Sequence, residues 1–448
     1  MTRLRQVMLP GYLLLCLLVG GSSQAIWGNA ILQILAVGIL AWAALTRDAP
    51  RLPRTARPLL TITGALLLLI LAQTLPLPPS IWTAIPGRQF VADGFRQLGM
   101  ALPWMPSSLA PYDTLTTAMT LLPPLAVLVG MLRLRDWRMS WMLGAIVMAA
   151  VLSVLVGILQ VTGSNDAWYF YRITNLGVAV GTFANGNHFA TLLLVAIPAL
   201  AAVSASGLRS DNRQQRGLAG ACAAAAAAAL AIGAIMNSSA AFLLLGPPVA
   251  AASVLLAMRL PQQRVRQAAL AIVLLLVIAG GSVAILGDRF PGWGTNASIE
   301  TRIGFWTTTL EATKTEGLAG SGFGTFEKAY SRYEDPAVVD RFYVNHAHND
   351  YLELALEGGV PAVILIVAFL IWWGGRVRGA WFSASSSAEQ KAAAVMSAAI
   401  LLHSLFDYPL RTAAIMAAMA TALAILAGAK GTIRPAKPDE QRARHATL

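Results

Sequence analysis

The segment from Tyr343 to Pro361, YVNHAHNDYLELALEGGVP, gathers side chains that could act on a polar substrate. It combines two of the five histidines with three carboxylates, in a chain of which only 12% is charged: His346, His348, Asp350, Glu353 and Glu357. Histidine titrates near neutral pH and is the commonest general base in enzymes. The segment therefore indicates acid–base chemistry.

The same segment contains the signals of a helix start. Asn349 or Asp350 can cap a helix, and Glu353 is placed as the reciprocal partner of Asp350 in a capping box. Gly358-Gly359 followed by a proline predicts the end of this short helix. His348 then precedes a helix N-terminus, where the partial positive charge favours an anion and a neutral imidazole. These features make His348 a candidate general base.

A divalent metal site is an alternative for the same residues. His346 and Asp350 are spaced i,i+4, and Glu353 and Glu357 continue the acidic stripe. However, the HExxH order is absent, and helix capping accounts for the acids without a metal. The sequence therefore predicts no metal and no cofactor.

A glycine-rich stretch lies upstream, with Gly320, Gly322 and Gly324 in GLAGSGFGTF. Such a GxGxG pattern can cradle a phosphate, but alone it is a weak signal. No GKS or GKT follows it, which argues against a nucleotide P-loop.

The elements that position these residues are expected to be membrane helices. The chain has 448 residues, is 56% hydrophobic and has a mean hydropathy of +0.62. Long uninterrupted apolar runs indicate helices rather than the alternating strands of a barrel. The net charge of +12 fits basic cytoplasmic loops better than nucleic-acid binding. Both cysteines lie in apolar runs, so no disulfide framework is expected.

Hydropathy thus predicts an all-α polytopic membrane protein with about twelve transmembrane helices. The expected spans are 7–24, 28–45, 59–75, 112–132, 139–161, 188–206, 218–236, 240–258, 268–286, 359–375, 392–408 and 412–428. They divide the chain into helices 1–5 (1–162), helices 6–9 with a polar aromatic element (163–286), a long partly helical periplasmic loop (287–358), helices 10–12 (359–429) and a basic cytoplasmic tail (430–448).

The distribution of Lys and Arg orients these spans. Basic residues recur in every second loop, which the positive-inside rule places in the cytoplasm together with both termini. The segments 75–111, 163–187 and 287–345 then lie outside, and the first is predicted to be a loop with a short helix. The outer side would collect the polar residues Arg172, His188, Arg302, His346, His348, Asp407 and Arg411.

Ionisable residues at or within a membrane are functional candidates by default. Simpler interpretations also exist. His188 and His403 could be packing histidines, and Arg172 could contact lipid headgroups. Asp407 and Arg411, spaced i,i+4, could form a structural ion pair.

Four sequence elements in this order resemble the O-antigen ligase and polymerase superfamily. They are the HAHNDYLELALEGGVPA helix start, the preceding RIGFW and GLAGSGFGTF stretches, the earlier GTFANGNHFA and the late HSLFDYPLR. The resemblance extends from about residue 168 to the last predicted span, whereas the first third of the chain matches only in hydropathy.

The resemblance implies a GT-C-like membrane glycosyltransferase of the bacterial inner membrane with a periplasmic active site. Its donor would be a glycan on undecaprenyl diphosphate, and transfer to an acceptor hydroxyl would invert the anomeric centre without a metal. The acceptor would be lipid A-core, a growing glycan or a protein. Membrane lipid surrounds such a protein, and no nucleic acid is expected.

The resemblance also implies roles for individual residues. His348 would be the base, with His346 as the other possibility, and Arg302 would be catalytic as well as a diphosphate ligand. A diphosphate leaving group calls for fixed guanidinium charge, available from Arg172, Arg302, Arg341 and Arg411. Supporting or glycan-binding roles fall to His346, Asn349, Asp350, Tyr351, Glu353, Trp306, Asn185, Asn187, His188, His403 and Asp407.

A transporter or flippase of lipid-linked sugars is the alternative function, because twelve spans with both termini inside is a common transporter layout. A transporter would place ionisable groups near the bilayer midplane and often contains inverted repeats. Here the polar residues gather at one face and no repeat is visible, which favours the enzyme.

Overall fold

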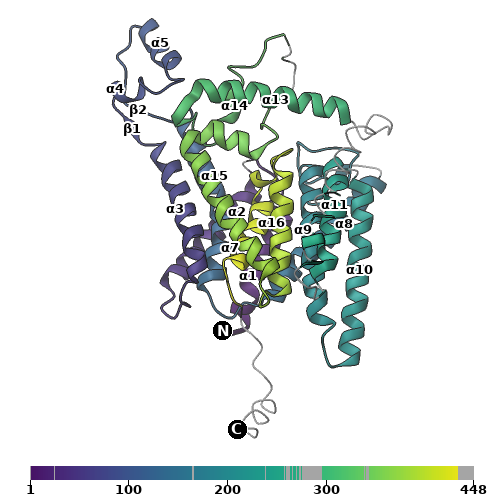
Figure 1. Cartoon of the computed structure of the whole chain (residues 1–448). Helices are drawn as coiled ribbons and strands as arrows, with labels where there is room; N and C mark the ends of the chain where they lie inside the picture. The colour runs from purple at the N-terminus through teal and green to yellow at the C-terminus, as the bar shows by residue number, and fades with distance from the viewer. Residues whose placement is uncertain are drawn as a thin grey trace.

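The structure is a computed structural model of the chain. It describes residues 2–431 apart from residue 25, residues 164 and 165, residues 238 and 257, most of 259–294, and residues 338 and 340–342. Within this part, a bundle of roughly parallel and antiparallel helices is covered at one end by helices that lie across it (Figure 1).

Apolar helices form the bundle. Seven helices among the described residues are long and apolar enough to cross a membrane, and shorter apolar helices accompany them. At a rise of 1.5 Å per residue, about 20 residues match a hydrocarbon core of about 30 Å. The bundle helices are α1 (Thr2–Val19), α2 (Trp27–Leu45), α3 (Arg57–Ala72), α6 (Pro111–Thr120), α7 (Leu122–Arg133), α8 (Met139–Thr162), α9 (Gly186–Gly207), α10 (Arg213–Asn237), α11 (Ala240–Leu256), α15 (Asp350–Phe382), α16 (Ala388–His403) and α17 (Ala413–Leu426).

These helices establish a polytopic helical membrane protein, as predicted. They overlap the expected spans except 268–286, which lies largely outside the described residues. The count of twelve and the orientation of the termini stay predictions.

Two helices form the centre of the bundle. α9 packs against α8, α10, α11 and α16, while α17 packs against α1, α7 and α16. Both helices are rich in buried alanine, and small side chains let neighbouring helices approach closely. The ends of α9 and α17 near the crossing helices are therefore held in fixed positions.

The crossing layer contains α13 (Thr295–Glu316) and α14 (Phe326–Tyr330) (Figure 1). Beside it lies the segment that precedes α6, with α4 (Pro79–Trp82), α5 (Gln89–Gln97) and a two-stranded pair of β1 (Pro76–Leu77) with β2 (Met105–Pro106). The prediction of a short helix within 75–111 is confirmed. The strand pair was not predicted.

A buried ion pair joins these two parts of the outer layer. Arg88 Nη1 lies 2.5 Å from Glu316 Oε2, with both side chains almost fully buried, and Arg88 Nη2 donates to the carbonyl of Gly320 at 2.7 Å. Arg332 Nη1 lies 2.9 Å from the other Glu316 oxygen. Because breaking a buried pair is costly, this contact fixes the end of α13 and the glycine-rich stretch against the segment before α6.

Helix α15 is interrupted where the sequence predicted a break. Asn349 is its N-cap and accepts hydrogen bonds from the backbone N–H groups of Tyr351 and Leu352. Gly359 has φ 59° and ψ −154°, which separates a short first segment from a long second one. The second segment continues to Phe382, so the expected span of 359–375 was too short. Arg376 and Arg378, which follow that span, are helical.

Candidate functional site

Four segments bring polar side chains together beneath the crossing layer. α13 contributes Arg302 and Trp306, and the segment before α15 contributes His346 and His348. The N-terminus of α9 and the connection between α16 and α17 complete the site with Asn187, His188, Asp407, Tyr408 and Arg411. These residues form two groups, one around Asp407 and one around Arg411.

Asp407 is the centre of the first group, and its carboxylate is buried. Asn187 Nδ2 donates to Asp407 Oδ2 at 2.6 Å, and Arg302 Nη2 lies 3.7 Å from the same oxygen. His188 Nε2 lies 3.6 Å from Oδ1, which also accepts the backbone N–H of Tyr408. The carboxylate thus orients Arg302, whose side chain stays 24% exposed and accessible to a ligand.

His348 lies next to this group in a defined tautomer. Its Nδ1 is 3.0 Å from the carbonyl oxygen of His346, and because a carbonyl only accepts, Nδ1 carries the proton. In the described part of the chain, Nε2 has no hydrogen-bond partner. Burial lowers the pKa of His348, Asp407 counteracts this and Arg302 reinforces it. The imidazole is therefore a neutral base with an open Nε2.

The backbone of His348 is also unusual. Its φ of 52° lies in the left-handed region, which few residues other than glycine adopt. The Trp306 indole N–H donates to the His348 carbonyl at 3.4 Å, and the His348 ring packs beside Phe305. Strained conformations of this kind persist where the surroundings fix them, commonly at functional sites.

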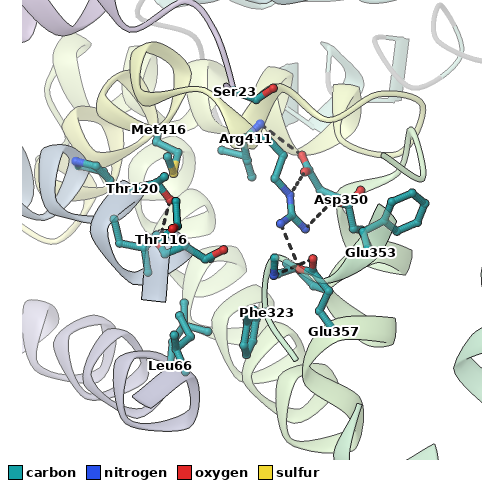
Figure 2. A pocket seen from close by; sticks show the side chains of 18 of the residues that line it. Ser23, Leu66, Thr116, Thr120, Phe323, Asp350, Glu353, Glu357, Arg411 and Met416 are labelled. Atoms are coloured by element: carbon teal, nitrogen blue, oxygen red, sulfur yellow. Dashed lines mark hydrogen bonds and ion pairs between the residues drawn. The ribbon is translucent and has the colours of Figure 1, made fainter. Parts of the chain in front are cut away.

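Arg411 is the centre of the second group (Figure 2). Its guanidinium lies 3.5 Å from Asp350 Oδ1, 3.3 Å from Glu353 Oε1 and 3.1 Å from Glu357 Oε2. All three carboxylates are buried. Their charge compensates Arg411, which argues against the diphosphate-binding role that the resemblance implied for it.

The sequence spacing suggested an Asp407–Arg411 ion pair and an Asp350–Glu353 capping box, and the structure contains neither. Asp407 and Arg411 have separate partners instead of forming an ion pair, because α16 ends at His403 and a 3₁₀ turn (Pro409–Arg411) follows. Glu353 accepts from the backbone N–H of Ala347 at 2.9 Å instead of closing a capping box with Asp350. Among the described residues, no three His, Cys, Asp or Glu side chains are arranged to hold a metal ion.

His346 belongs to the Arg411 group rather than to the Asp407 group. Its Nδ1 donates to Glu353 Oε1 at 2.7 Å. Its ring packs on Tyr408 at 4.2 Å between centroids, and the Tyr408 ring also contacts His188 and His348, each at 4.9 Å. Tyr408 is therefore the link between the two groups.

The glycine-rich stretch supports the helix break and does not form an open anion cradle. The backbone N–H groups of Ser321 and Gly322 donate to carbonyl oxygens at the end of the first α15 segment, and Gly324 N–H donates to Glu357 Oε1 at 2.9 Å. Phe323 N–H donates to the side chain of Gln73 at 3.0 Å. Four successive N–H groups are thus used inside the protein, which leaves none of them for a phosphate.

The other predicted site residues are spread around these groups. Asn185 caps α9, His403 Nδ1 lies 2.7 Å from Thr191 Oγ1, and the Tyr351 hydroxyl donates to the Leu401 carbonyl. Arg172 is exposed in the segment before α9, and no described contact joins it to Arg302. Arg341 lies outside the described residues.

Some residues of the site were missed from the sequence. Tyr408 directly follows Asp407 in the FDYP element, so its position next to a predicted residue was the available signal. Gln73 is an uncharged polar residue at the end of an apolar span, and its amide bonds to Glu357 and Phe323 backbone groups. A polar residue within an apolar membrane span costs free energy, so it is a candidate for a structural or functional role.

Residues 223–367 match the O-antigen ligase family. The chain carries an O-antigen ligase domain. The matched range includes Arg302, His346 and His348, together with the glycine-rich stretch. Asp407, the ion-pair partner of Arg302, lies outside the matched range, as do the α9 residues Asn187 and His188 that contact Asp407. The fold brings these residues to the O-antigen ligase domain. A comparison with curated proteins finds no match to the chain.

Proposed function

We propose that this protein is an integral membrane glycosyltransferase that moves a glycan from undecaprenyl diphosphate to an acceptor hydroxyl. O-antigen ligase family membership implies a glycosyltransferase that uses lipid-linked glycans. The observation that carries the proposal is the pairing of a neutral, half-buried His348, with Nε2 open, and an accessible Arg302 held by Asp407.

In the proposed step, the acceptor oxygen attacks the anomeric carbon while His348 Nε2 takes the hydroxyl proton. The bond from the anomeric carbon to the phosphate oxygen breaks, and the electron pair leaves with the lipid diphosphate. Attack from the side opposite the leaving group inverts the anomeric configuration. The products are the glycosylated acceptor, undecaprenyl diphosphate and a protonated His348, which returns its proton to solvent.

Arg302 would stabilise the charge that develops on the diphosphate. A guanidinium presents its N–H donors in a fixed fork that fits phosphate oxygens. It stabilises the charge of the transition state more strongly when it is already held in place before the reaction. Asp407 supplies that orientation through Oδ2, while leaving part of the Arg302 side chain exposed. Arg172 and Arg341 remain additional candidate ligands for the diphosphate.

The proposed active site faces the periplasm. This follows from the distribution of basic residues, which puts both termini in the cytoplasm and the crossing layer outside. The start of α1 lies at the end of the bundle opposite α13 and α14, in agreement with that orientation (Figure 1). Lipid A-core, a growing glycan and a protein hydroxyl all remain candidate acceptors, so ligase and polymerase activities are both open.

The test is transfer in vitro with purified protein, a lipid-diphosphate glycan and each acceptor in turn, followed by gel mobility of the product. His348→Ala should lower the rate by about 10²–10⁴-fold, as expected for loss of a general base. Arg302→Lys should lower it by about 10²–10³-fold, because a point charge replaces the fork. Lys314→Met, which removes an exposed charge at the far end of α13, should leave it unchanged.

His346→Ala decides between the two histidines. If the His346→Ala variant is folded and its transfer rate falls as far as that of His348→Ala, His348 is not the sole base. If all four variants transfer at the wild-type rate, the proposal fails. Movement of the donor across a sealed bilayer without any glycosylated product would support a transporter instead.

A further inference from the structure

The carboxylate of Glu353 holds the segment that carries the proposed base. Glu353 lies in the first turn of α15 and is buried. Its Oε2 accepts the backbone N–H of Ala347 at 2.9 Å, and its Oε1 lies 2.7 Å from His346 Nδ1. On its other side, Arg411 Nη2 lies 3.3 Å from Oε1, so Glu353 is part of an ion pair. The carboxylate therefore joins the Arg411 group to the segment before α15.

The peptide group between His346 and Ala347 extends this contact to the imidazole of His348. Its N–H donates to Glu353, and its C=O accepts from His348 Nδ1 at 3.0 Å. A trans peptide is planar, with its N–H and C=O pointing in opposite directions, so the direction of one bond fixes that of the other. A continuous chain of hydrogen bonds thus runs from the Glu353 carboxylate, through one peptide group, to Nδ1 of the proposed base.

The surrounding contacts keep this chain in place. The His348 ring packs beside Phe305 and edge-on against Tyr408. The His348 carbonyl accepts from the Trp306 indole at 3.4 Å, and the next residue, Asn349, caps α15. The positive φ of His348 turns its ring back towards the carbonyl two residues earlier. The backbone of this segment is therefore arranged so that Nδ1 meets that carbonyl.

A carboxylate in such a chain acts on the imidazole without touching it. Linked hydrogen bonds polarise one another, and an ionised acceptor makes a stronger bond than a neutral one. Because the peptide N–H donates to Glu353, the carbonyl oxygen of the same peptide becomes a better acceptor for His348 Nδ1–H. This favours the tautomer with Nε2 free, and it stabilises the imidazolium that forms when Nε2 takes a proton. In serine proteases an aspartate does the same by direct contact with Nδ1–H.

We propose that Glu353 is a positioning residue for His348 and acts through the peptide group between His346 and Ala347. The inference deepens the proposed function and rests on it for the role of His348 as the base. Arg411 holds the carboxylate from its other side. A second route is the direct contact of Glu353 with the His346 ring, which would make His346 the base. The experiment has to separate these two routes.

The test compares two glutamine variants of the same buried group. Glu353→Gln removes the charge next to the peptide, and Arg411 keeps the carboxylates of Asp350 and Glu357. Glu357→Gln is the matched control, because Glu357 is also buried and also pairs with Arg411 (Figure 2). Its Oε1 accepts the backbone N–H of Gly324, in the glycine-rich stretch. Effects on the shared Arg411 group should therefore appear in both variants.

Nitrogen-15 spectra of the histidine rings provide a readout that needs no substrate. The chain has five histidines, so selective labelling gives few signals, and His348→Ala identifies those of His348. In the wild type, Nδ1 should be protonated and Nε2 bare. In Glu353→Gln, the fraction of this tautomer should fall, because the peptide carbonyl is a weaker acceptor. In Glu357→Gln it should stay as in the wild type. Unchanged His348 signals in Glu353→Gln would overturn the proposal.

The titration of the His348 ring should change in the same variant. Without the Glu353 charge the imidazolium is less stable, so the ring should titrate at lower pH than in the wild type. The other titratable groups around it are Arg302 on α13, Asp407 and Tyr408 after α16, and His346 in its own segment. They are the same in both glutamine variants. An equal displacement in Glu357→Gln would show a general effect of charge and contradict the link through the peptide.

Transfer rates test the link in the reaction. Loss of the aspartate from the serine-protease triad lowers kcat by about 10⁴-fold, and a smaller effect is expected with a peptide in between. Glu353→Gln should have a kcat about 10–10²-fold below that of Glu357→Gln, with a similar KM for the donor. Equal kcat values in the two variants would refute the positioning role.

A second background separates the two routes. In His346→Ala, the substitution Glu353→Gln should still lower kcat by the same factor, because the peptide group remains. Disappearance of that factor would show that Glu353 acts through the His346 ring and would overturn the proposal. Absence of transfer by the wild type would refute the proposed function. The nitrogen-15 spectra would then still decide whether Glu353 controls the His348 ring.

Discussion

Removal of the Arg411 guanidinium should destabilise the protein rather than weaken donor binding alone. Arg411→Met leaves Asp350, Glu353 and Glu357 buried without their cation, each now lacking a contact of 3.1–3.5 Å. Breaking a buried ion pair costs about 3–5 kcal/mol, because the remaining charge has lost its water and gained no partner. With three carboxylates involved, we expect a loss at the upper end of that range.

A compensated variant separates this cost from any role in binding. Arg411→Met combined with Glu353→Gln and Glu357→Gln removes two of the three uncompensated charges, and the glutamine side-chain oxygens can still accept from Ala347 and Gly324. The third carboxylate, Asp350, keeps the hydrogen bonds that its Oδ2 accepts from Ser404 and the Leu410 N–H. Replacement of a buried charged group by neutral side chains is often neutral for stability. The triple variant should therefore recover most of the stability lost in the single variant.

The assay is unfolding by denaturant in mixed micelles, followed by tryptophan fluorescence, with donor affinity measured on the folded fraction. Arg96→Met is the control, since this exposed arginine pairs only with Asp93 among the described residues and such pairs contribute little. The account is refuted if Arg411→Met unfolds at the wild-type denaturant concentration while its donor affinity falls. That result would make Arg411 a diphosphate ligand.

Three further predictions concern the rest of the site. Because the pKa of His348 is lowered from its usual 6.5, the acid limb of the rate profile should lie below pH 6.5, and Arg302→Gln should move it to higher pH in a pH–rate measurement on the residual activity. Asp407→Asn should reduce transfer by about 10²-fold through misorientation of Arg302, with folding retained because Asn187 keeps a partner. Gly320→Ala should destabilise the protein by about 1–3 kcal/mol in the unfolding assay, since its Cβ would lie 2.5 Å from the Glu357 carbonyl oxygen, whereas Gly99→Ala, at a similar positive φ in open space, should cost less.

Local signals in the sequence were sufficient for most of the helices and for some of their ends. Membrane spans follow from the length of apolar runs, and the Asn349 cap and the break at Gly359 follow from residue types within one turn. Such features depend on the nearest few residues, so a single sequence contains them. The end of α15 at Phe382 was missed because arginines continue the helix beyond the apolar run.

The pairing of charges could not be predicted in the same way. Asp407 and Arg411 are four residues apart, yet α16 ends at His403, before both of them, and each meets partners from distant segments. Arg302 and Asp407 are 105 positions apart in the sequence, and the packing of α13 against α15 and of α15 against α16 brings them together. In the glycine-rich stretch, backbone N–H groups likewise donate to oxygen atoms next to the break in α15. The spacing of the glycines alone does not reveal these hydrogen bonds.

The most direct measurement of the central claim is a single-turnover transfer with donor and acceptor both saturating, comparing the wild type with His348→Gln. Glutamine keeps a polar side chain at this position but cannot take a proton at neutral pH. The account predicts that the chemical rate falls by about 10²–10⁴-fold while donor and acceptor still bind. A rate within a few-fold of the wild type would show that His348 is not the base.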